Sequence, residues 1–326
     1  MTVPRPPVHR VLPLLLGILL VSGAAGAWWL DTARPVPPDE LVRAEAWLVT
    51  EALLGTPGPA AERTDVRADL DRQLEALGPA PDDRARAAVG DPGPSPADGA
   101  PADGEADGDT LGDAGAPSAA ALRTTAMALA EDALAAEDPA LARVLAAAAV
   151  SRSAAARQLE GGTAPAGADL CDATAGPAGG AGETGAVLWS ALDRAGYSFE
   201  ALAARAGSAA QEPGPDGAAV AAAAERGVED VEELLGAPAA RPVLEAAPGL
   251  AAGAYVLPAD VREHPGRAAD AAARDVQDAA AHVLARGDAG SRCWALVALE
   301  RATGLRAGLT GEVGALPGVL RDDPPR

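Results

Sequence analysis

Residues 139–159 read PALARVLAAAAVSRSAAARQL, and this stretch indicates the fold class most directly. Alanine has the highest intrinsic helix propensity, and a proline at the first helical position is typical of a helix start. A second Ala/Leu stretch at 118–137 precedes it, with Asp138-Pro139 as the hinge. The chain is 48% hydrophobic but only 2% aromatic, so its backbones must approach closely to form a core. Close-packed alanine suits helices better than sheets, and we predict an all-α protein.

Apolar residues at helical spacing predict six further helices, at residues 38–54, 61–77, 184–207, 217–236, 267–286 and 291–309. The first two would form a helical hairpin within residues 31–77, and residues 118–160 would form a second hairpin. Four helices in each half of the chain suggest two bundles. An ordered crossover is expected at residues 237–266, in the middle of the second bundle.

Two Gly-rich segments and a tail connect or follow the predicted helices. Residues 78–117 are rich in Pro, Gly and Asp, and we expect a disordered acidic linker there, because little apolar surface offsets the entropy of ordering. Residues 161–182 form a Gly/Ala linker that contains Cys171, and residues 311–326 form a C-terminal tail.

Residues 11–30 are an uncharged, largely apolar stretch, just long enough to cross a bilayer as a helix. Basic residues precede it and Asp31 follows, which orients residues 1–10 to the cytoplasm and the body outside. The alternative is a cleaved signal peptide, because Ala25-Gly26-Ala27 has the small-x-small pattern of a cleavage site. We expect a single-pass protein of the cell membrane with its body outside the cytoplasm, or a secreted protein if cleavage follows Ala27.

The charge of the chain bears on its partners. The formal net charge is −21, with 47 acidic and 26 basic residues, and every basic residue is Arg. An acidic surface without a basic cluster argues against nucleic acid, because such binding requires neutralised phosphates. The expected partners are the membrane, through the N-terminal helix, and an unknown envelope protein or a small apolar ligand.

The two cysteines of the chain are Cys171 and Cys293. In an exported protein two cysteines usually pair, and a bridge here would tie the 161–182 linker to the start of the last predicted helix. Its structural contribution would be on the order of 4–5 kcal/mol by the chain-entropy model. The alternative is a pair of free thiols.

Histidine is the scarcest metal ligand of the sequence. A di-iron bundle needs two Glu-x-x-His motifs, and the chain has three His in total: His9, His264 and His282. Asp278 and His282 share a helix face at i,i+4 and would bind a metal only weakly, since a zinc site needs a third protein ligand. No resident metal or cofactor is therefore expected.

Three other patterns imitate functional sites. The acidic run at 103–109 resembles the start of an EF-hand loop, but Ala114 stands where the closing Glu belongs. The carboxylates at 225–233 are expected to be a solvated helix face rather than a hydrolase pair. The aromatic residues of the body are expected to fill the core, namely Trp47, Trp189, Tyr197, Phe199, Tyr255 and Trp294. No nucleophile elbow, phosphate loop or dinucleotide motif is present, and no catalytic residue is assigned.

A family resemblance is carried by Gly253-Ala254-Tyr255-Val256-Leu257-Pro258, His264-Pro265, Ala268-Ala269 and the stretch 295–302, ALVALERA. These residues resemble a ferritin-like domain of unknown function found in exported proteins of high-G+C bacteria. The likeness covers residues 183–310, and it extends more weakly to 118–159. It implies a four-helix bundle with a long crossover between its second and third helices.

The chain departs from that family at the positions of its polar residues. Where such domains carry Glu-His in the first helix and His in the second, this sequence has Asp193, Arg194 and Ala224. A Glu-x-x-His of the preceding region would fall on Arg152 and Ala155. We therefore predict a non-enzymatic, membrane-tethered helical module of the cell envelope whose bundle lacks metal ligands, with an interaction or structural role. The alternative is a metal-binding or oxidoreductase bundle that uses carboxylates and His282.

Overall fold

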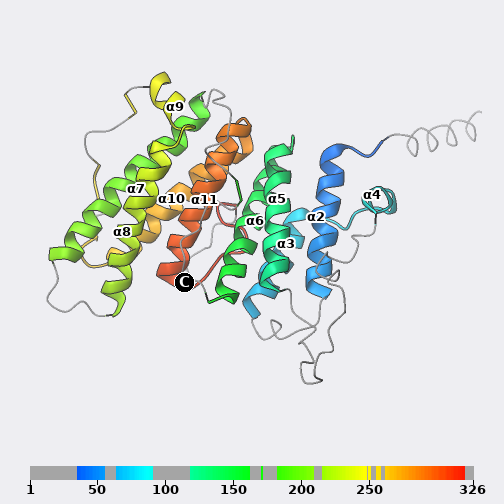
Figure 1. The fold of residues 1–326 in the computed structure, drawn as a ribbon, viewed down its shortest axis with the longest axis horizontal. Coiled ribbons are helices and arrows are strands. Elements are labelled where there is room, and N and C mark those ends of the chain that lie inside the picture. The colour runs from blue at the N-terminus through cyan, green and yellow to red at the C-terminus, as the bar shows by residue number, and fades with distance from the viewer. Residues whose placement is uncertain are drawn as a thin grey trace, which may run out of the picture.

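The computed structural model describes residues 35–55, 64–90, 118–161, 170–171, 182–208, 215–247, 249–250, 255–257 and 261–319. Ten helices and no strand occur in these ranges, so the predicted all-α class is confirmed for them (Figure 1). The predicted anchor or signal at 11–30, the imitation calcium loop and His9 lie outside the described residues. Within the described part, no helix is both long enough and apolar enough to span a membrane.

Every helix that the sequence predicts is present. In the first half they are α2 (Pro38–Gly55), α3 (Thr64–Leu77), α5 (Ala119–Ala135) and α6 (Pro139–Leu159). In the second half they are α7 (Gly182–Ser208), α8 (Pro215–Gly236), α10 (Pro265–Arg286) and α11 (Ala289–Thr310). The predicted break between the two helices at Asp138-Pro139 is also confirmed. The Asp138 carboxylate accepts the Ala140 N–H at 2.8 Å and caps α6.

Two short helices were not predicted. Helix α4 (Asp83–Val89) lies inside the stretch 78–117, so the expectation of disorder is wrong for these residues. The Asp82 carboxylate accepts the Ala85 N–H at 2.7 Å, and Ala85 is buried, which together fix this helix. Helix α9 (Arg241–Ala246) lies in the crossover between α8 and α10 and buries Val243.

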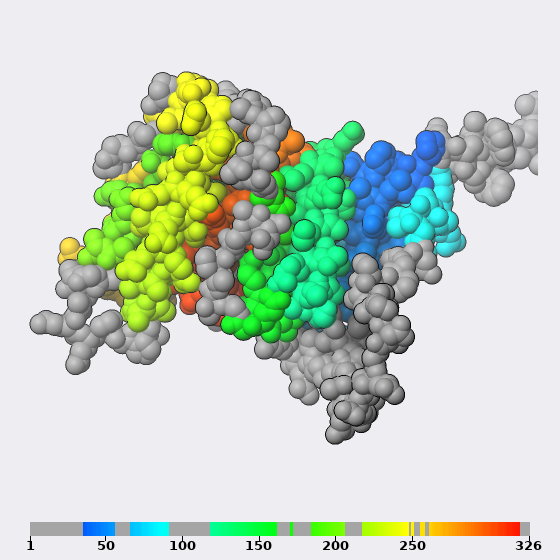
Figure 2. Space-filling view, viewed as in Figure 1, coloured from blue at the N-terminus to red at the C-terminus, as the bar shows by residue number. Residues whose placement is uncertain are grey.

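The helices form one row with the α10–α11 pair at its centre (Figure 1). Helices α7 and α8 pack on one side of this pair, and α6, followed by α5, packs on the other. Helices α2, α3 and α4 continue the row at the far end, and Figure 2 shows their blue and cyan surface beside the green of α5 and α6. The α7, α8, α10 and α11 helices together make a four-helix bundle.

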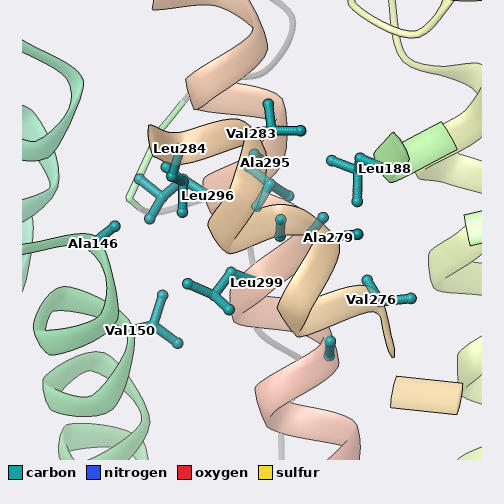
Figure 3. Close-up of a cluster of buried hydrophobic side chains, with 14 of the residues drawn as sticks. Ala146, Val150, Leu188, Val276, Ala279, Val283, Leu284, Ala295, Leu296 and Leu299 are labelled. Carbon is teal, nitrogen blue, oxygen red and sulfur yellow. The ribbon is translucent and has the colours of Figure 1, made fainter. Parts of the chain in front are cut away.

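The two halves of the chain share a core, so the predicted groups of helices pack as one unit in the described residues. One buried cluster contains Leu145 of α6, Leu188 of α7 and Leu299 of α11. Figure 3 shows Ala146 and Val150 of α6 facing Leu284, Leu296 and Leu299. Every residue of α6 from Leu145 to Ala156 is buried, since it has helices on both sides. Its alanines let both neighbours approach closely, so α6 joins the halves.

Glycine has a similar role between α7 and α8. A Cβ atom added to Gly227 of α8 would lie 2.6 Å from the Phe199 ring of α7, inside van der Waals contact. The aromatic prediction is confirmed for Trp189, Phe199 and Trp294, which are buried. It is wrong for Tyr197, which is exposed.

Cys171 and Cys293 form a disulfide, as predicted, with their Cα atoms 5.8 Å apart. The bond fixes the 170–171 segment to the first turns of α11, and Leu170 is buried beside it. The predicted tail also contributes to the core in its described part, because Ala315 and Leu316 are buried. Its turn lies directly against α10, where a Cβ on Gly318 would lie 2.7 Å from the Gln277 carbonyl oxygen.

Candidate functional site: a cavity between α6, α10 and the C-terminal turn

A cavity of about 520 Å³ opens where the start of α6 meets the end of α10. Its volume lies within the range of small-molecule sites. Three elements line it: Pro139, Ala140 and Arg143 of α6; Asp278, His282, Ala285 and Arg286 of α10; and Gly318 and Val319 of the C-terminal turn. The cavity therefore joins parts of the chain that are far apart in sequence.

Local sequence explains each wall. Asp278, His282 and Arg286 recur every four residues along α10, which places them on one face. Arg143 lies one turn after Pro139, so it points from the first turns of α6. Gly318 has a φ of 72°, in the left-handed region that glycine favours, and this conformation brings the turn against α10 as the third wall.

Arg143 and Arg286 carry the positive charge of the cavity. Arg143 donates from Nη2 to the Gly318 carbonyl oxygen at 3.3 Å, and its buried Nε has no partner among the described residues. Arg286 donates from Nη1 to His282 Nδ1 at 2.8 Å. Within the described ranges neither guanidinium forms an ion pair with a carboxylate. Two arginines thus share one cavity in a chain with nearly twice as many acids as bases.

The predicted Asp278–His282 pair does line this cavity. A ring nitrogen of His282 accepts a hydrogen bond from a guanidinium, which is a poor neighbour for a divalent cation because the like charges repel. His264 lies at the opposite end of α10, at its N-cap position, and is exposed. In the part of the chain that the structure describes, no three or more His, Cys, Asp or Glu side chains are grouped to hold a metal.

A second polar cluster, around Arg152, is fully enclosed. Arg152 of α6 is 1% exposed and donates from Nε to Gln73 Oε1 at 3.0 Å and from Nη2 to Thr50 Oγ1. Gln73 in turn donates from Nε2 to the Ala315 carbonyl oxygen at 3.3 Å. Burial lowers the pKa of the Arg152 guanidinium, because desolvation disfavours its charged form. This cluster ties α2, α3 and α6 to the C-terminal turn.

Carboxylates of α8 and α11 pair with arginines across the bundle. Glu300 is 0% exposed and accepts from Ser153 Oγ at 3.1 Å and from Arg157 Nη1 at 2.7 Å. The predicted solvated face at 225–233 is confirmed for Glu225, Glu229 and Glu232, which are exposed.

Asp230 departs from that prediction, because Arg301 of α11 lies 3.4 Å from it and 2.6 Å from the exposed Glu233. Burial raises the pKa of Asp230 to about 6 despite this cation.

The residues that stand in place of the ferritin-like family's polar residues make structural contacts in this chain. Ala155 and Ala224 are buried in helix contacts. The Tyr255 hydroxyl donates to Asp193 Oδ2 at 2.6 Å, and the Arg194 guanidinium lies 5.8 Å from the centre of the Tyr255 ring. These residues hold the crossover segment 255–257 onto α7.

Comparison with protein-family models, with curated proteins and with solved structures finds no match to this chain. The assignment of this candidate site therefore rests on the residues that line the cavity. Sequence reasoning identified Asp278 and His282 but missed Arg143 and Arg286. The i,i+4 spacing from His282 to Arg286 was the one signal that pointed to Arg286, while nothing in the sequence places Arg143 beside it.

Proposed function

We propose that this chain is a non-enzymatic helical module of the cell envelope, tethered by residues 11–30, with its body outside the cytoplasm. The observation that carries this proposal is the Cys171–Cys293 disulfide. Disulfides persist in oxidising compartments and are rare in the cytosol. The basic residues before the apolar stretch and the acidic body after it favour the same orientation.

The proposed role is interaction or structural support rather than catalysis. Continuous burial from α7 to α6 and the enclosed Arg152 cluster make a stiff row of helices, which suits a protein that presents a surface. We further infer, from the resemblance described above, that α7, α8, α10 and α11 are a ferritin-like bundle. The order of two helices, a crossover with α9, and two further helices supports this inference.

Location and topology are tested by expressing the full chain in a bacterium and treating intact cells with protease. The expected result is a chain in the membrane fraction whose body is degraded from outside. On a non-reducing gel it should run faster than its reduced form. Cys171→Ser/Cys293→Ser is the matched control and should lose the mobility difference. A body protected from outside protease, with two free thiols, would refute the proposal. An N-terminus at Trp28 in the mature protein would replace the tether with a secreted form.

A small apolar ligand is a second proposal, favoured by a separate cavity of about 200 Å³ between α7, α10 and the crossover. Its walls include Leu202, Leu257 and Val261, and they are mainly apolar. Native mass spectrometry of the purified chain should show a bound lipid-like mass that disappears in Ala195→Trp, which fills the cavity. Ala222→Trp, on the exposed side of α8, is the control. An unliganded mass in the parent chain would contradict this second proposal.

A further inference from the structure

We propose that the cavity between α6, α10 and the C-terminal turn binds the oxyanion group of a small molecule, with Arg143 and Arg286 as the anion-binding residues. The inference adds a ligand class to the proposed interaction role. It does not depend on where the protein resides, since it concerns the purified chain alone. The shared chemistry is that of a carboxylate or a phosphate.

Both guanidiniums have donors that no carboxylate among the described residues accepts. Among the described residues, Arg143 donates to a carbonyl oxygen and Arg286 donates to a ring nitrogen of His282. Some other arginines of the body are held by carboxylates, such as Arg306 by Asp270 at 2.8 Å and Arg157 by Glu300 at 2.7 Å. Arg143 and Arg286 therefore keep donors that a carboxylate or phosphate can accept.

The two cations come from different walls of one cavity. Arg143 belongs to α6 and Arg286 to α10, and both line the same 520 Å³ space. An anion in the cavity is thus contacted by a guanidinium on each of two sides. Two such contacts favour the bound state over the solvated anion more than a single exposed arginine would. The buried Arg143 Nε, which has no hydrogen-bond partner among the described residues, shows that part of this site is already desolvated.

A carboxylate in the wall of the cavity bears on which anions it selects. Asp278 lies on the same face of α10 as His282 and Arg286, and it makes no ion pair with another described residue. Its carboxylate repels anions, and the repulsion grows with the charge of the ligand. The site is therefore expected to favour a singly charged oxyanion over a polyanion, and removal of the Asp278 charge should tighten binding.

The test is isothermal titration calorimetry of the full chain, at fixed ionic strength, with two probes: acetate, a singly charged carboxylate, and inorganic phosphate. Saturable binding of either probe is expected, and the tighter one identifies the oxyanion. Arg143→Gln/Arg286→Gln should weaken binding at least tenfold, and Asp278→Asn should tighten it two- to fivefold. No saturable binding of either probe would overturn the proposal.

Arg267→Gln is the matched control for Arg286→Gln, because Arg267 is an exposed arginine at the opposite end of α10 and its loss changes the net charge by the same single unit. It should change the affinity less than twofold. Circular dichroism checks the fold of each variant. If the double variant unfolds, Arg286→Gln alone is decisive, because Arg286 is exposed and its loss leaves the core intact. Equal affinity in Arg286→Gln and Arg267→Gln would overturn the proposal.

A further pair of variants separates an external ligand from the chain's own acids. Asp322 and Asp323 follow Val319 closely in sequence and could supply competing carboxylates. Asp322→Asn/Asp323→Asn should bind the probe as tightly as the parent chain or more tightly. Loss of binding in this variant would contradict a site for an external anion.

Discussion

Arg152 and Gln73 meet inside the row of helices, Nε to Oε1 at 3.0 Å, and in the described part of the chain no carboxylate forms an ion pair with this arginine. The buried charge is held by a side-chain amide, a hydroxyl and the helices around them. Burial of such a cation costs desolvation free energy. Each neutral hydrogen-bond partner therefore contributes more to stability here than it would at the surface.

Gln73→Leu should therefore destabilise the protein by about 2–3 kcal/mol, because it leaves the Arg152 Nε without its acceptor and the Ala315 carbonyl without its donor. Gln73→Glu restores an acceptor with a negative charge and should be less destabilising than Gln73→Leu. Urea unfolding followed by circular dichroism measures both. Equal losses in the two variants would show that Arg152 does not need an acceptor at this position.

Loss of the disulfide should lower the free energy of unfolding by about 3–5 kcal/mol, because the open chain gains conformational entropy in the unfolded state. The comparison is between the parent chain and Cys171→Ser/Cys293→Ser, each with and without reductant. Reductant should destabilise only the parent. A parent chain that unfolds at the same urea concentration in both conditions would contradict this expectation.

Asp132 should make stability depend on pH. Burial, together with the nearby Glu45 and Glu131, raises its pKa from 3.8 to about 6. The folded state then binds the proton more tightly than the unfolded state, so the free energy of unfolding rises as pH falls from about 7 to 4.

Asp132→Asn removes this titration and should be about 1–2 kcal/mol more stable than the parent at pH 7, with no difference at pH 4. Urea unfolding at the two pH values gives the comparison. A constant difference between parent and variant would show that Asp132 is not the titrating group.

Gly227→Ala should destabilise the protein by about 1–3 kcal/mol, since the added methyl group would overlap the Phe199 ring. Phe199→Leu in the same chain should recover part of the loss. Gly304→Ala is the control, because it is also within a helix but has no atom within 4 Å of the added Cβ, and it should gain about 0.5–1 kcal/mol. Thermal unfolding distinguishes these outcomes, and equal effects at Gly227 and Gly304 would contradict the close approach of α7 and α8.

The helices were predictable because their signals are local. Pro139 after Asp138 marks the start of α6, and the apolar spacing continues to Leu159, where the helix ends. Helix α4 was missed because about two turns of apolar pattern are too short to stand out from a Pro- and Asp-rich stretch. The contact of α6 with α10 and α11 was also missed, since a helix rich in alanine does not show which neighbour each face meets.

The candidate site depends on that missed contact. Asp278, His282 and Arg286 are predictable as one face from their spacing, but Arg143 joins them only because α6 packs beside α10. The turn that brings Gly318 to the cavity also has no periodic signal, and its position is fixed by close packing on Gln277. Sequence patterns therefore indicate one wall of the cavity, whereas tertiary packing supplies the other two.

The Cys171–Cys293 bond also determines how the molecule would carry force. It closes a covalent ring that contains α7, α8, α9 and α10, and it joins the segment after α6 directly to α11. Tension applied between the two ends of the chain passes across the sulfur atoms and bypasses the ring. The cysteines are separated by 122 residues in sequence, so the bond prevents roughly 400 Å of chain from being extended, at about 3.3–3.6 Å per residue. Half of the helical row would thus stay unstretched while the rest of the protein is pulled.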